Sequence, residues 1–86
     1  MKDQAKLRDI VAKNVYRFRK DAKLTQEELA KRANIASSTI ARIETNSKAP
    51  SLDLCDCIAD ALQCNSVDLF VDIASENKRS KNQERI

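Results

Sequence analysis

A capping box followed by two short helical patterns constrains this chain more than any other feature. In residues 25–44 (TQEELAKRANIASSTIARIE), Thr25 stands three positions before Glu28, so each side chain can bond the other residue's backbone amide at a helix start. Apolar residues then recur at helical spacing until Asn34, a residue type that tolerates the left-handed conformation at helix ends. A second helix is expected to begin near Ser37. The stretch therefore predicts two helices joined by a tight turn.

The second of these helices has two different faces. At 100° per residue, Ile40 and Ile43 point to one side of the helix and predict contact with a core. The opposite side, an arc of about 140°, carries small residues and one guanidinium: Ser37, Ser38, Ala41, Arg42 and Thr45. Small side chains allow a helix to enter a groove deeply enough to reach base edges. This pattern indicates a helix that reads DNA.

The sequence around these two helices resembles the helix-turn-helix domain of the phage repressor and Cro (XRE-like) family over roughly residues 7–73. The matching segments are Phe18-Arg19, Leu24 to Ala30, Ser38-Thr39-Ile40, Arg42-Ile43-Glu44, Pro50-Ser51-Leu52, Ile58-Ala59, Ala61-Leu62 and Leu69-Phe70. Asn34 and Asn46 stand where the family usually has Gly, and Ala36 stands where it has a capping Ser or Thr. The missing cap is expected to weaken the start of the second helix by about 1 kcal/mol.

The composition and the resemblance both predict an all-α fold. The 86 residues include no Gly and one Pro, which disfavours hairpin turns, and they suffice for one small core. The resemblance implies a compact five-helix lambda-repressor-like domain over residues 1–74, with the helix-turn-helix at helices two and three. Helices are expected at residues 4–22, between Thr25 and Asn34, and at residues 37–45, 52–62 and 66–74. Residues 75–86 are expected to form a polar, disordered tail.

Charge is distributed unevenly along the chain. Residues 1–48 hold 12 Lys or Arg and 6 Asp or Glu, whereas residues 49–74 hold five Asp and no Lys or Arg. This asymmetry would direct phosphate attraction to the helix-turn-helix half. The alternative is ordinary variation among solvated helices. In the tail, Lys78, Arg79 and Lys81 are either solvated or form a secondary contact with DNA or a partner.

The resemblance assigns roles to individual residues. Base reading is expected from Ser37, Ser38, Ala41 and Arg42. Arg42 could bond a guanine or a phosphate, and Ala41 could touch a thymine methyl. The two serines could instead satisfy amides of the first helical turn. Contacts with the DNA backbone are expected from Gln26, Thr39, Thr45, Ser47 and Lys48.

A structural ion pair between Arg19 and Glu44 is also implied by the resemblance. The helical wheel places Glu44 at the boundary of the buried side, where a carboxylate needs a partner and Arg offers a bidentate one. The alternative is two exposed charges that do not interact.

The fifth expected helix, residues 66–74, is apolar on more than one side. A small core cannot cover all of these side chains, and in the family the last helix commonly forms a two-fold contact. The sequence therefore predicts a homodimer through Val67, Leu69, Phe70 and Ile73.

Other chemistry is poorly supported. The three cysteines, at positions 55, 57 and 64, have no His beside them and fall short of a structural zinc set. We expect Cys55 and Cys64 in the core and Cys57 exposed, and we expect no metal, no cofactor and no enzymatic activity. No apolar run is long enough to span a membrane, and the charged N-terminus does not resemble a secretory signal. A cytoplasmic location is therefore expected.

These observations predict a sequence-specific, DNA-binding transcriptional regulator. The expected mode of action is repression, with a homodimer binding a palindromic operator of double-stranded DNA through the major groove. The alternative is an antitoxin-like or regulator-binding module, in which the apolar fifth helix binds a protein partner.

Overall fold

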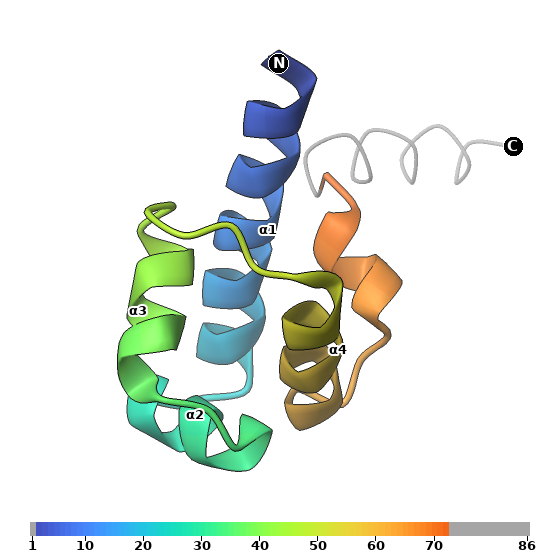
Figure 1. The fold of residues 1–86 in the computed structure, drawn as a ribbon. Coiled ribbons are helices and arrows are strands. Elements are labelled where there is room, and N and C mark those ends of the chain that lie inside the picture. Colours follow the sequence, from blue (N-terminus) through green and yellow to red (C-terminus); the bar gives the residue numbers. More distant parts are fainter. Residues whose placement is uncertain (1, 73–86) are drawn as a thin grey trace, which may run out of the picture.

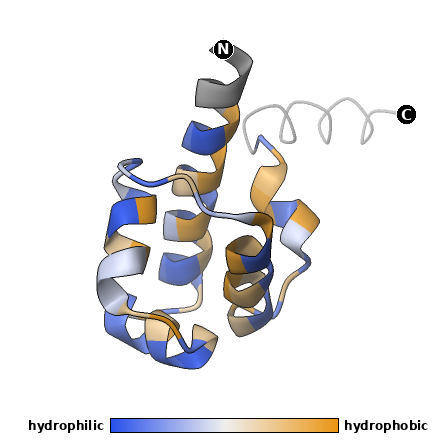
Figure 2. Cartoon of the chain, viewed as in Figure 1, coloured by the Kyte–Doolittle hydropathy of each residue, from blue (hydrophilic) through white to orange (hydrophobic). Residues whose placement is uncertain are grey.

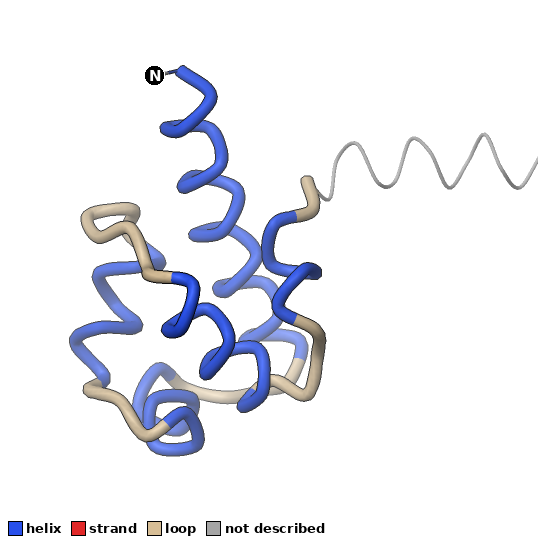
Figure 3. The backbone as a smooth tube through the Cα atoms, turned by 45° about the vertical axis from the view of Figure 1, so that its right-hand side comes forward, coloured by secondary structure: helices blue, strands red, loops and turns tan. Residues whose placement is uncertain are grey.

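The computed structural model describes residues 2–72, with side chains from Leu7 onward. These residues form four α-helices and one short 3-10 helix: α1 (Lys2–Asp21), α2 (Gln26–Ala33), α3 (Ser37–Glu44), α4 (Leu52–Ala61) and η1 (Ser66–Phe70). The long helix α1 lies between α3 on one side and η1 on the other (Figure 1). Short loops join the helices, and α3 lies at one edge of the fold in both views (Figures 1 and 3). The fold is all-helical over the described range, as predicted.

Residues 66–72, the described part of the expected fifth helix, form no α-helix, and the five-helix count is therefore wrong. A 3-10 helix of 5 residues, Ser66–Phe70, stands there, and Val71 is already extended with φ −88° and ψ 126°. Asn14 of α1 anchors this end of the chain: its Nδ2 donates to the carbonyls of Leu69 and Val71, both at 2.8 Å. Ile73 and the tail lie outside the described residues.

Each α-helix is followed, one or two residues after its end, by a left-handed residue that is not glycine. The four residues are Lys23, Asn34, Asn46 and Gln63, with φ between 61° and 64°. At the end of α1, for example, the Leu24 amide bonds the Arg19 carbonyl at 3.1 Å and the Lys23 amide bonds the Lys20 carbonyl at 2.9 Å. This pair of bonds is the Schellman motif. Asn34 and Asn46 thus adopt the conformation for which the family usually has Gly.

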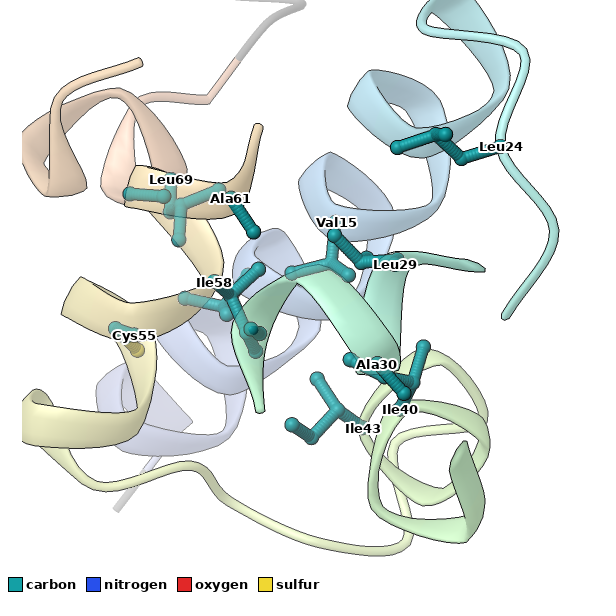
Figure 4. Close-up of a cluster of buried hydrophobic side chains, with 13 residues drawn as sticks. Val15, Leu24, Leu29, Ala30, Ile40, Ile43, Cys55, Ile58, Ala61 and Leu69 are labelled. Carbon is teal, nitrogen blue, oxygen red and sulfur yellow. The ribbon is translucent and has the colours of Figure 1, made fainter. Parts of the chain in front are cut away.

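One apolar core holds all the elements together. Hydrophilic and hydrophobic residues alternate along the helices, so each helix has an inward apolar face (Figure 2). The largest fully buried apolar side chains are Val15, Leu29, Ile40, Ile43, Ile58 and Leu69 (Figure 4). Because every element supplies at least one of them, α3 is held in place by packing as well as by its connections. None of the helices in residues 2–72 is long and apolar enough to cross a bilayer.

Candidate nucleic-acid interface

The start of α2 is fixed by the capping box expected from the sequence. The Glu28 amide donates to Thr25 Oγ1 at 3.0 Å, and the Thr25 amide donates to Glu28 Oε1 at 2.8 Å. At the other end, Asn34 is left-handed and the Ile35 amide bonds the Ala30 carbonyl at 2.9 Å. These local bonds set the turn that directs the chain into α3.

The two faces of α3 differ as the periodicity predicts. Ile40 is 0% exposed and Ile43 1% exposed. Among the predicted DNA-contacting residues, Ser37, Ser38 and Arg42 are exposed, and Thr39 and Ala41 are half-buried. The helix therefore presents short hydroxyls and one guanidinium to solvent, which suits entry into a major groove.

The N-terminus of α3 lacks a side-chain cap, as expected from Ala36. Ala36 is extended, with φ −74° and ψ 142°, and makes no capping bond from its side chain. Its carbonyl still accepts from the Thr39 amide at 3.0 Å. Because the first amides of a helix have no intrahelical partner, the uncapped end of α3 leaves backbone donors beside the two exposed serines.

Arg19 and Glu44 form the ion pair that the resemblance implied. Arg19 Nε donates to Glu44 Oε2 at 2.7 Å and Arg19 Nη2 donates to Glu44 Oε1 at 3.0 Å. The two side chains are only 9% and 5% exposed. Hydrogen bonding with Glu44 raises the pKa of Arg19, although burial acts in the opposite direction. Arg19 Nη1 also donates to the Leu24 carbonyl at 2.8 Å, so this pair ties α1, the following loop and α3 together.

Gln26, the first residue of α2, joins the same network. Its side-chain Nε2 donates to Glu44 Oε1 at 3.0 Å, and the side chain is half-buried. The sequence predicts a phosphate contact for Gln26 and contains no local signal for this bond, because the partners are 18 residues apart.

Thr45 and Ser47, two of the residues expected on the DNA backbone, bond to their own helix. Each hydroxyl donates to the Arg42 carbonyl at 3.2 Å, and the two oxygens lie 3.1 Å apart. The backbone amides of Thr45 and Ser47 also donate to carbonyls of α3. A hydroxyl carries one proton and phosphate oxygens only accept hydrogen bonds. Either side chain can therefore donate to a phosphate only after breaking its hydrogen bond with the Arg42 carbonyl. Lys48, by contrast, is an exposed cation.

The residues predicted for the dimer contact separate into two groups. Leu69 is 0% exposed and packs with Ile58 and Ala61 in the core of the chain (Figure 4), so its assignment to an interface is wrong. Val67 is 67% exposed and Phe70 is half-buried. The reason is the 3-10 geometry, in which residues three apart share a face. Val67 and Phe70 therefore lie on a different face from Leu69, although Phe70 is also packed in part against the core. Ile73 lies outside the described residues.

The three cysteines occupy different environments. Cys55 is buried, Cys64 is half-buried and Cys57 is exposed. Burial raises the pKa of the Cys55 thiol; burial, with a contribution from the charge of Asp68, raises that of Cys64. Within the part of the chain that the structure describes, no three His, Cys, Asp or Glu side chains are grouped to hold a metal ion.

A two-faced second helix, a capped first helix and a fixed turn between them define a helix-turn-helix DNA-binding domain. The model of the helix-turn-helix family HTH_3 matches residues 15–69, and the chain belongs to this family of DNA-binding transcriptional regulators. A comparison with curated proteins finds no match.

Solved structures show the same fold. A hypothetical transcription factor, NHTF, from Neisseria has a TM-score of 0.80 and 25% identity, covering 84% of this chain and 83% of that one. The clp gene regulator ClgR from Corynebacterium glutamicum has a TM-score of 0.74 and 24% identity, covering 92% and 84% of the two chains. An HTH_3 family transcriptional regulator from Vibrio cholerae has a TM-score of 0.74 and 18% identity, and the match covers 77% of this chain and 37% of that one.

Proposed function

We propose that the protein is a sequence-specific transcriptional repressor that places α3 in the major groove of its operator. One observation carries the proposal: Ile40 and Ile43 are buried, while Ser37, Ser38 and Arg42 are exposed on a helix at the edge of the fold. The buried ion pair supports it, because it fixes the end of α3 against α1.

The residues of α3 suggest how a sequence would be read. Arg42 would donate bidentately to a guanine, and Ser37 and Ser38 would contribute less selective hydrogen bonds. Ala41 would contact a thymine methyl. Thr39 and Lys48 would bond phosphates beside the groove, which positions the helix without specifying sequence.

Binding as a homodimer on a palindromic operator is the second part of the proposal. The exposed Val67 and the half-buried Phe70 share a face of η1, and Leu52 at the start of α4 is 77% exposed. Sedimentation of the protein tests this part of the proposal. Repression would follow from occupancy alone, because a bound dimer excludes other proteins from the same DNA.

Selection of bound sequences from a random duplex pool tests this function. The expected product is a palindrome whose half-sites lie about one helical turn apart. Affinity for it should fall steeply with salt concentration, because phosphate contacts release counterions. If no duplex is retained at low salt, the proposal is refuted and a protein-interaction module becomes the better explanation.

A further inference from the structure

We propose that Glu44 is a positioning residue for DNA binding, because it holds the side-chain amide of Gln26 with one N–H group available to a phosphate. This inference rests on the proposed function and assigns Glu44 a role beyond the ion pair.

The hydrogen bonds of Glu44 divide into two sets. Arg19 donates to both carboxylate oxygens, at 2.7 Å and 3.0 Å, and by itself balances the charge of Glu44. Gln26 Nε2 adds a third bond, at 3.0 Å to Oε1. This third bond is not needed for charge balance. Its physical effect is on the conformation of Gln26, a side chain with three rotatable bonds at the start of α2.

The polarity of the contact fixes which way the amide faces. An ionised carboxylate only accepts hydrogen bonds, so the nitrogen of Gln26 and not its oxygen must face Glu44. That nitrogen carries two hydrogens, and Glu44 Oε1 takes one of them. The second hydrogen remains for another acceptor. Phosphate oxygens are acceptors, so a Gln26 amide held this way presents the correct group to the DNA backbone.

Holding the side chain in the free protein also saves entropy on binding. Ordering a glutamine side chain at an interface is unfavourable, and a side chain already ordered avoids most of that cost. We therefore expect Gln26 to strengthen DNA binding by about three- to tenfold when Glu44 is present, and much less when it is absent.

A double-mutant cycle tests the coupling. Gln26→Ala is made in the unchanged protein and in a background carrying Arg19→Met with Glu44→Leu, which removes both charges and leaves neither buried alone. Affinity for the selected duplex is measured in all four proteins, with urea unfolding as the measure of folding. The expected result is a loss of about three- to tenfold in the unchanged protein and a clearly smaller loss in the second background. Lys48→Ala is the control and should reduce the affinity for the duplex by the same factor in both backgrounds.

The outcomes separate the inference from the function on which it rests. Equal losses from Gln26→Ala in both backgrounds would show that Gln26 acts without Glu44 and would overturn the inference. No loss in either background would also overturn it, while leaving groove reading by α3 intact. Failure of the unchanged protein to bind any duplex would instead refute the proposed function.

A second measurement needs no substitution and no DNA. Side-chain ¹⁵N relaxation of the free protein reports the order of each glutamine NH₂ group. The Gln26 group should be clearly more ordered than that of Gln63, which is exposed and serves as an internal control. Equal disorder of the two groups would overturn the positioning role, even if the double-substituted background fails to fold.

Discussion

Replacing Asn46 by glycine should stabilise the protein more than the same substitution at Asn34. Both residues are left-handed, with φ 64° and 61°, and both follow a helix of the helix-turn-helix. They differ in one respect: the side-chain oxygen of Asn46 is buried without a hydrogen-bond partner among the described residues, whereas Asn34 is exposed. Comparison of the two variants therefore isolates the cost of that oxygen.

The expected magnitude follows from this difference. A buried polar atom that makes no hydrogen bond costs about 1–3 kcal/mol. The backbone contribution is common to both sites: glycine relieves the left-handed strain but loses more chain entropy on folding, and these effects nearly cancel for Asn. We expect Asn34→Gly to change the free energy of unfolding by less than about 0.5 kcal/mol, and Asn46→Gly to raise it by about 1–3 kcal/mol.

Urea unfolding monitored by circular dichroism measures the free energy of unfolding of both variants, and thermal unfolding checks the two values. In a domain of this size, 1 kcal/mol shifts the melting temperature by about 4–8 °C. Arg17→Gly in the right-handed interior of α1 replaces an exposed good helix former and provides a control of opposite sign, which should destabilise by about 0.5–1 kcal/mol. Equal effects at Asn34 and Asn46 would refute the reasoning, because the buried oxygen would then cost nothing.

The remaining predictions concern the surface and the cysteines. Arg42→Ala should weaken operator binding by about 1–3 kcal/mol and relax the preference at one base pair. The control Arg32→Ala should have neither effect. An equal loss of affinity on every sequence would instead make Arg42 a phosphate ligand. Val67→Asp should give a folded monomer in sedimentation that binds palindromes weakly, and an unchanged dimer mass would exclude η1 from the interface. Cys57 should react with iodoacetamide in the folded protein, whereas Cys55 should react only on unfolding. Burial raises the pKa of the Cys55 thiol, so the contribution of this thiol to stability is complete below about pH 8 and is lost at higher pH. Cys55→Ala should therefore reduce the loss of stability at alkaline pH.

Most of the confirmed predictions depend on residues that are close together in the chain. The capping box at Thr25, the left-handed Asn34 and the inward isoleucines of α3 each follow from spacings of one to four residues. Local backbone geometry sets these relations, so they can be derived without knowing how the helices pack. The pairing of Arg19 with Glu44 spans 25 residues and was predicted only through the family resemblance.

The incorrect predictions all concern residues whose conformation or burial depends on contacts with residues distant in the sequence. The apolar pattern of residues 66–74 fits a helix, but residues 66–70 form a 3-10 turn, and its Leu69 carbonyl accepts from Asn14, 55 residues away in the sequence. That shortening to a 3-10 turn also places Leu69 in the core, leaving Val67 and Phe70 on another face.

The sequence by itself determined where α2 and α3 begin and end and which face of α3 is polar, since these depend on propensity and on neighbours within one helical turn. Only the tertiary structure decided what Asn14 and Gln26 bond and which apolar side chains near the end of the described chain remain exposed. Such contacts join residues that are brought together when the core forms, and no local spacing records them.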